Sequence, residues 1–379
     1  MDIDKLLRFM VEKGASDAFI TAGVAPSLKI NGKVMPVSDK VLTGEQTEKI
    51  IVGVMSEAQK KEFYEHHECN FAVARDVGRF RASAFYQRNL CGMVLRRIET
   101  IIPTMEQLQL PPVIKELAMT KRGLVIFVGA TGTGKSTSLA SMIGYRNKNS
   151  TGHIISIEDP IEFIHEHAGC IVTQREVGID TESFDVALKN TLRQAPDVIM
   201  IGEVRTQQTM EQALTFAETG HLCLCTLHAN NANQALDRIQ HFFPHERQGQ
   251  VWMDLSLNLK GMVAQQLVPT RDGKSRRAVI EVLLNTPLVA DLIRKGEVHQ
   301  LKELMSKSNE QGMQTFDQAL FKLYKEGEID EEKALAHADS RNDLRLMIKL
   351  DADGTDPLAN APELTMEMPD EDNSRGFGR

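Results

Sequence analysis

Apolar and polar residues alternate in short segments over the first hundred residues of the chain. Apolar positions three and four apart predict a helix from Ile3 to Val11, which Gly14 ends. The segments that follow are typical of strands between turns, and Asn31-Gly32 between two of them indicates a hairpin. Residues 1–100 are therefore predicted to form a small α+β domain. We expect its strands at 18–21, 28–30, 34–37, 71–73, 79–88 and 93–97, and a second helix over 44–65.

The apolar pattern changes after residue 112. Pro103, Pro111 and Pro112 interrupt residues 101–112, which we interpret as a linker. Beyond it, short continuous apolar runs lie between helical patterns, as the buried strands of a parallel sheet require. Residues 113–350 are therefore predicted to form an α/β domain with a mostly parallel sheet. We expect its strands at 124–128, 154–157, 198–201 and 222–227, and helices from 249 to 350.

Composition and charge limit the classes of protein that remain. The chain has 379 residues and a formal net charge of −8, and no run of 18 apolar residues, so we expect no transmembrane segment. Its start does not resemble a secretory signal, and five scattered cysteines without a Cys-x-x-Cys pair favour a reducing, cytoplasmic location. Residues 351–379 are rich in acidic residues and poor in large apolar ones, and we predict a disordered acidic tail there. Because the tail carries eight acidic and two basic residues, the rest of the chain is nearly neutral.

A phosphate-binding motif stands at the start of the second domain. Residues 129–136 match G-x-x-x-x-G-K-[ST], with an apolar run before them and a helical pattern after them. Glycines let backbone N–H groups turn toward phosphate oxygens, and the N-terminus of the following helix adds a positive dipole. Lys135 would reach the β- and γ-phosphates of ATP, and Ser136 would offer an oxygen to Mg²⁺. The candidate nucleotide-binding residues are Gly129, Thr131, Gly132, Thr133, Gly134, Lys135, Ser136 and Thr137.

Further candidates follow three of the predicted strands. Acidic residues follow the strand at 154–157, up to Glu162, and Glu203 follows the strand at 198–201. Ligands bind at the carboxyl ends of parallel strands, so these acids are candidates for handling metal and water. His221 and His228 flank the strand at 222–227, where they would sense the γ-phosphate, bridge subunits or serve a structural role. We interpret Cys223 and Cys225 between them as core residues and not as zinc ligands.

Together these segments resemble the PilT/GspE family of secretion-type ATPases over about residues 1–345. The resemblance implies a RecA-like P-loop ATPase domain preceded by a smaller, PAS-like α+β domain. Gly14-Ala-Ser-Asp17 resembles a motif of the type IV pilus retraction branch, which comprises PilT and its paralogue PilU. The matching segments are the Walker A loop at 129–137, the Asp box IEDPIEF at 157–163, the Walker B region PDVIMIGEVR at 196–205 and the His box TGHLCLCTLH at 219–228.

The resemblance also implies roles for individual residues. Glu162 would be the base or water-orienting carboxylate, and Glu203 the acid that supports Mg²⁺ together with Ser136. His221 and His228 would read the nucleotide or the neighbouring subunit. The family directs arginines of its N-terminal domain toward phosphate, and Arg81 and Arg96 are the best matches.

The resemblance finally implies a cytoplasmic homo-hexamer, peripheral to the inner membrane at the pilus base, that hydrolyses Mg-ATP to support twitching motility. Its partners would be a PilT-type paralogue and an inner-membrane pilus platform protein, and no nucleic acid is expected. Departures from the PilT pattern at Phe19, Ala195, Thr206 and Ala290 indicate a PilU-like accessory to a PilT-type motor. Two alternatives stay open: a weakly catalytic or non-catalytic partner subunit, and a DNA-translocating or conjugation-type ATPase.

Overall fold

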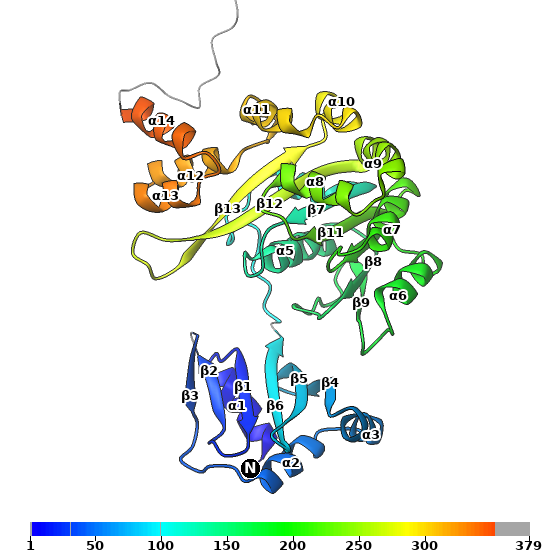
Figure 1. Ribbon diagram of the computed structural model, residues 1–379, viewed down its shortest axis with the longest axis vertical. Coiled ribbons are helices and arrows are strands. Elements are labelled where there is room, and N and C mark those ends of the chain that lie inside the picture. The colour runs from blue at the N-terminus through cyan, green and yellow to red at the C-terminus, as the bar shows by residue number, and fades with distance from the viewer. Residues whose placement is uncertain (1, 31, 99, 353–379) are drawn as a thin grey trace, which may run out of the picture.

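The computed structural model describes residues 2–30, 32–98 and 100–352, so the predicted tail lies outside the described residues from residue 353 onward. Two sheets organise the chain, a smaller one formed by the N-terminal part and a larger one above it (Figure 1). The described residues between Ile98 and Val113 form turns and extended chain instead of a helix or strand. Among the described helices, none combines the length and the apolar character that crossing a membrane requires.

The N-terminal sheet is antiparallel, with its six strands in the order β3-β2-β1-β6-β5-β4. Its strands are β1 Asp17–Thr21, β2 Ser27–Ile30, β3 Lys33–Pro36, β4 Glu68–Arg75, β5 Gly78–Gln87 and β6 Leu90–Ile98. A separate apolar core joins one face of this sheet to helices α1 Ile3–Glu12, α2 Gly44–Val52 and α3 Glu57–His66. The single helix predicted over 44–65 is wrong, because Thr43 and Ser56 each begin a helix with a capping box of its own.

The larger sheet has the order β13-β12-β7-β11-β10-β8-β9, and every neighbouring pair except β12 with β13 is parallel. This confirms the predicted fold class, a smaller α+β part followed along the chain by an α/β part with a mostly parallel sheet. Every residue of β7, β10 and β11 is buried, which explains their continuous apolar sequences. The strands are β7 Gly123–Val128, β8 Gly152–Glu158, β9 Cys170–Glu176, β10 Val198–Ile201, β11 Leu222–Leu227, β12 Leu259–Pro269 and β13 Arg276–Leu284.

Helices cover both faces of the larger sheet. Helices α4 and α5 pack against one face, and α6 to α9 pack against the other. The C-terminal helices α10 to α14 pack into the same core as α6 to α9 (Figure 1). The helices are α4 Val113–Met119, α5 Lys135–Asn149, α6 Phe184–Thr191, α7 Gln207–Glu218, α8 Ala232–His241, α9 His245–Asn258, α10 Pro287–Lys295, α11 Leu301–Ser306, α12 Phe316–Lys325, α13 Glu331–His337 and α14 Arg341–Ala352.

The prediction of helices from 249 to 350 is wrong in part, because β12 and β13 form an antiparallel pair within this range. The turn between them contains Asp272-Gly273, and Gly273 has φ of +68°, a conformation that glycine adopts without steric cost. Strand β12 is buried along most of its length, because neighbouring strands lie on both sides and helices cover it. Burial on both faces removes the alternating pattern by which an exposed strand is recognised.

A buried carboxylate joins β13 to the start of α8. Glu281 is 1% exposed and accepts a hydrogen bond of 2.9 Å from the backbone N–H of Ala232. Burial raises the pKa of Glu281 from 4.5 to about 7, although the Ala232 N–H and the charge of Lys302 act in the opposite direction. Between these two pH values the folded chain therefore holds a proton that the unfolded chain has lost. Ionisation of Glu281 then reduces the free energy of unfolding as the pH rises.

We expect the variant Glu281→Gln to gain stability relative to the wild type as the pH rises from 5 to 8. Glutamine keeps an oxygen for the Ala232 N–H and carries no charge, so the variant avoids an ionisation cost on the order of 3 kcal/mol. Thermal unfolding of both proteins at several pH values measures the difference in Tm. The exposed Glu246→Gln in α9 is the control, whose difference from wild type should stay constant. A constant difference for Glu281→Gln would contradict this prediction.

Candidate active site

The glycine loop between β7 and α5 is shaped by its own glycines and by a side chain from β12. Gly132 and Gly134 have φ of +80° and +85°, and Gly134 precedes the first turn of α5. A Cβ atom at Gly134 would lie 2.7 Å from the amide nitrogen of Gln265. Gln265 is buried, donates to the Thr133 carbonyl at 2.8 Å and accepts from the Ser138 hydroxyl at 2.8 Å. The loop is therefore held from behind by one amide that the sequence analysis did not identify.

Lys135 and Ser136 lie on the first turn of α5 and line a cavity of about 280 Å³. The Lys135 ammonium donates to the carbonyls of Gly129 at 2.7 Å and Ala130 at 2.8 Å. Burial lowers the pKa of Lys135, and the nearby Glu203 carboxylate opposes this change. Thr131 and Gly132 also line the cavity, whereas Gly129, Thr133, Gly134 and Thr137 belong to the loop and helix behind it.

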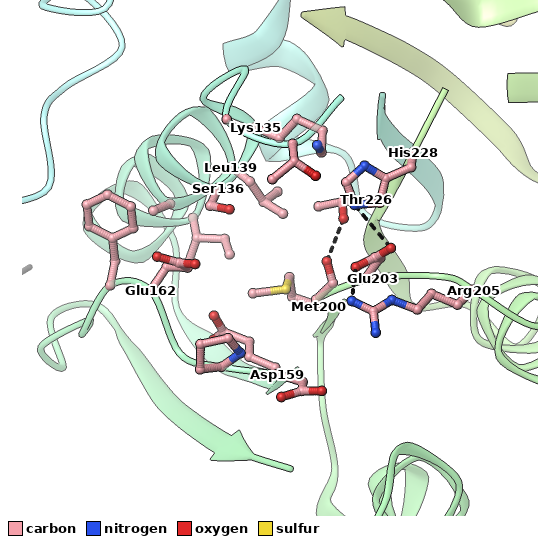
Figure 2. Close-up of a pocket in the computed structure, with 18 of the residues that line it drawn as sticks. Lys135, Ser136, Leu139, Asp159, Glu162, Met200, Glu203, Arg205, Thr226 and His228 are labelled. Atoms are coloured by element: carbon pink, nitrogen blue, oxygen red, sulfur yellow. Dashed lines mark hydrogen bonds and ion pairs between the residues drawn. The ribbon is translucent and has the colours of Figure 1, made fainter. Parts of the chain in front are cut away.

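Both predicted acids face the same cavity. Glu162 comes from the loop after β8, and Glu203 follows β10. Figure 2 shows Glu162 on one side of the cavity, Glu203 and His228 on the opposite side, and Lys135 near the α5 turn. The structure therefore brings together one cation, two acids and a histidine from four segments that are far apart in sequence.

Glu203 is held by two basic neighbours. The Arg205 guanidinium donates to one carboxylate oxygen at 2.7 Å, and His228 Nε2 lies 3.2 Å from the other (Figure 2). Burial alone would raise the pKa of Glu203, but the hydrogen bond from Arg205 and the charges of His228 and Lys135 lower it overall. Glu203 is therefore ionised at neutral pH and presents an anionic oxygen to the cavity. Arg205 is the last residue of the Walker B segment, and the motif alone gave no role to it.

Glu158 also lines the cavity, as one of the acidic residues after the strand at 154–157, and the family resemblance gave it no individual role. It is the last residue of β8 and is 7% exposed. Burial raises the pKa of Glu158 to about 7, against the hydrogen bonds that it accepts from Ser156 Oγ at 2.7 Å and Gln174 Nε2 at 3.1 Å. The position of Glu158 in an acidic cluster was visible in the sequence, but its burial was not.

His221 lies away from this cavity. Its ring contacts Thr219 Oγ1 and the Phe216 carbonyl before β11 begins, whereas His228 follows the end of β11. The six residues of β11 separate the two histidines by roughly 20 Å. His221 therefore does not line the cavity of its own chain, and its role at the nucleotide or at a neighbouring subunit stays a prediction. Cys223 and Cys225 between them are fully buried in the core, and no cluster of metal-ligating side chains occurs in the described part of the chain.

The two predicted arginines lie on neighbouring strands of the N-terminal sheet, directly opposite each other. Arg81 lies 3.8 Å from a carboxylate oxygen of Asp159 and 4.0 Å from one of Glu176, so it faces the Asp box. Arg96 forms an ion pair of 2.9 Å with Asp17 and does not line the cavity of its own chain. A role for either arginine at phosphate stays a prediction.

A glycine loop between a buried parallel strand and a helix, faced by acids from the ends of neighbouring strands, defines a P-loop ATPase. The particular family follows from comparison with known proteins. Residues 2–329 match the family described as "Type II/IV secretion system protein", and the chain belongs to this family.

Two similar relatives are pilus proteins of Pseudomonas aeruginosa. The chain is 74% identical over 377 residues to the type IV pilus ATPase PilU, an alignment that covers 98% of each protein. It is 40% identical over 335 residues to the type IV pilus retractation ATPase PilT, which covers 88% of this chain and 97% of that protein. The expectation of an ATPase from the pilus retraction branch is thereby confirmed.

Solved structures agree with this placement. The crystal structure of the pilus retraction motor PilT with bound ADP superposes with a TM-score of 0.86 at 42% identity, covering 92% of this chain and 100% of that chain. The DotB ATPase of Legionella pneumophila superposes with a TM-score of 0.74 at 25% identity, covering 92% and 95%. The chain is a nucleotide-binding type IV pilus retraction ATPase.

Proposed function

We propose that this chain is a cytoplasmic motor subunit that hydrolyses Mg-ATP as a PilU-like accessory to a PilT-type retraction motor. The observation that carries the proposal is the meeting of Lys135, Ser136, Glu162, Glu203 and His228 around one cavity. A subunit that only bound nucleotide would need the loop and Lys135, but it would not need a carboxylate opposite them. The similarity of nearly the whole chain to PilU supports the accessory role.

Each side chain has a chemical task in this proposal. Lys135 and the backbone N–H groups of the loop hold the phosphates. The Ser136 hydroxyl and the ionised Glu203 are oxygen donors of the kind that Mg²⁺ prefers, so they fit the metal, which neutralises charge on the β- and γ-phosphates when bound. Glu162, on the opposite side, orients water and accepts its proton. His228 contacts Glu203 at 3.2 Å and thereby couples the His box to the site.

We propose a homo-hexamer in which the N-terminal domain, residues 1–100, lies against the ATPase domain, residues 113–350, of a neighbour. Residues 101–112 are then the hinge, and residues 351–379 the tail. Arg81 and Arg96 lie opposite each other on the same sheet face, and this pair could contribute two cations to a neighbour's phosphates. His221 is then free to contact a neighbouring subunit instead of its own nucleotide. The proposed target is an inner-membrane platform protein at the pilus base, supported by the identity of the relatives.

A non-catalytic partner subunit is the second candidate, because the chain departs from the PilT pattern. One departure is neutral in the structure: Thr206 caps α7 by accepting from the Thr209 N–H at 3.2 Å, which an aspartate would also do. Ala290 lies on α10 and Ala195 follows the short helical turn after α6, and neither lines the cavity. The departures therefore leave the proposed chemistry intact.

We expect the wild-type gene to restore twitching motility to a strain that lacks it, and Lys135→Ala to fail. The variant keeps the surface that a partner would bind but loses the cation that holds phosphate. The measurement is the width of the twitching zone, with protein levels matched by immunoblot. Lys148→Ala, at an exposed position of the same helix, is the control and should restore motility. Full restoration by Lys135→Ala would replace the motor proposal with the non-catalytic one.

A further inference from the structure

Glu162 lies on an irregular segment, and this raises the question of what fixes its position. The chain between the end of β8 at Glu158 and the start of β9 at Cys170 contains no helix or strand. A carboxylate on such a loop is displaced whenever the loop backbone moves. Its position therefore depends on the groups that bind the backbone close to it, and β9 supplies these groups.

A single amide of β9 binds the loop on the C-terminal side of Glu162. Gln174 donates from Nε2 to the Phe163 carbonyl at 2.9 Å, and its Oε1 accepts from the His165 backbone N–H at 2.8 Å. The same Nε2 donates to Glu158 Oε1 at 3.1 Å. The Gln174 amide thus bonds to Glu158 before Glu162 in the chain and to Phe163 and His165 after it.

Neighbouring carboxylates bind the other side of the segment. The Glu162 backbone N–H lowers the pKa of the nearby Glu158 carboxylate, and Glu176 accepts a hydrogen bond from the Ile161 N–H at 3.3 Å. Both acids are buried, and Gln174 is bonded to the first of them. The backbone from 161 to 165 is therefore held by the side chains of Gln174 and Glu176, and Gln174 also connects the loop to Glu158.

We propose that Gln174 is a positioning residue for hydrolysis, which acts by fixing Glu162 opposite the phosphate loop. The inference rests on the proposed role of Glu162. Gln174 does not line the cavity, so it does not touch the nucleotide itself. Loss of its three hydrogen bonds releases Phe163 and His165, and Glu162 moves with them. A shift of about 1 Å in a reacting group costs up to ~10²-fold in rate.

The experiment compares turnover with nucleotide binding. We expect Gln174→Leu to lower kcat by roughly 10- to 100-fold while the Kd of a fluorescent ADP analogue changes by less than about threefold. Gln174→Glu matches the volume and keeps the acceptor for the His165 N–H, but lacks the donor and adds a charge beside Glu158, so we expect a similar loss of kcat. A kcat within about twofold of wild type in both folded variants would overturn the inference.

A neighbouring residue separates positioning from general stability. Thr173 precedes Gln174 in β9 and its hydroxyl bonds to His153 Nε2 at 2.9 Å, away from the loop. Thr173→Val removes one hydrogen bond from the same strand, so we expect a reduced Tm with kcat unchanged. An equal loss of kcat in Thr173→Val would show that any damage to β9 slows turnover, and would also overturn the inference.

The double variant shows whether Gln174 acts through Glu162. If it does, Gln174→Leu should cause little further loss of kcat in protein that already carries Glu162→Gln. A further 10- to 100-fold loss in the double variant would show an independent action and overturn the inference. Normal turnover of Glu162→Gln alone would instead overturn the proposed role of Glu162 in hydrolysis. If only the positioning role of Gln174 fails, Glu162→Gln is inactive while Gln174→Leu keeps full activity.

Discussion

Lys135→Ala is expected to reduce ATP hydrolysis by at least ~10³-fold, to the background of the assay. Lys135 is the cation of the phosphate loop, and its ammonium lies beside the loop carbonyls of Gly129 and Ala130. Alanine removes the charge that the γ-phosphate needs in the transition state. Steady-state release of phosphate from the purified protein measures the effect. It is assayed with and without a PilT-type paralogue, because an accessory motor is expected to work beside one.

Lys148→Ala is the matched control for this substitution. Lys148 lies near the end of the same helix and is exposed, so its loss should leave hydrolysis within about twofold of wild type. Thermal unfolding of both variants shows whether α5 remains folded. Hydrolysis by Lys135→Ala at a rate near that of wild type would contradict the assignment of this cavity as the ATPase site.

Glu162→Gln is expected to bind ATP normally and to lose ~10²- to 10⁴-fold in the rate of hydrolysis. Glutamine has nearly the same shape as glutamate but cannot accept a proton from water. Single-turnover hydrolysis measures the rate, and a fluorescent ATP analogue measures binding. Because binding is retained, the variant should accumulate with ATP bound, whereas Lys135→Ala should lose affinity for nucleotide.

Glu166→Gln provides the control from the same loop. Glu166 is exposed and does not line the cavity, so its substitution should leave the rate unchanged. Turnover of Glu162→Gln close to the wild-type rate would remove Glu162 from the mechanism. Glu158, which faces the same cavity with a pKa of about 7, would then be the next carboxylate to test.

The sequence predicted best those elements whose pattern reflects complete burial or fixed spacing. Strands β7, β10 and β11 are almost wholly apolar and β8 contains an apolar segment, and each was placed within two residues of its observed ends. The phosphate loop was predictable because its glycines and Lys135 occur at fixed distances in the chain. The meeting of Glu162 with Glu203 followed from the rule that parallel strands present their carboxyl ends at one edge.

The sequence could not reveal strands β9 and β12, and the supporting side chains of the site lie on them. β12 was expected to be helical, and β9 is an edge strand with several polar residues. Gln265 holds the phosphate loop from β12, and Gln174 holds the Glu162 loop from β9. Glutamine has no distinctive sequence pattern, so only the arrangement of strands shows what these two amides bind.

The different positions of His221 and His228 follow from the direction of one strand. The His box shows two histidines at the ends of one apolar segment, and the sequence gives them equal weight. In a parallel sheet the two ends of a strand lie at opposite edges, and the phosphate loop occupies one edge alone. Only His228 therefore reaches Glu203. The direction of β11, which the motif does not encode, separates the two residues.

The contact of Arg81 with the Asp box has a mechanical consequence. Its separations of 3.8 and 4.0 Å from the carboxylate oxygens exceed hydrogen-bond length, so the contact is an attraction between charges without a fixed geometry. Such an attraction decreases gradually with distance, whereas a hydrogen bond is lost within about 1 Å. Arg81 therefore resists a small displacement between the N-terminal sheet and these acids less steeply than a hydrogen bond would. The Arg81 contact is therefore compliant, whereas the hydrogen bonds of Gln265 to the phosphate loop and of Gln174 to the Glu162 loop have a fixed geometry.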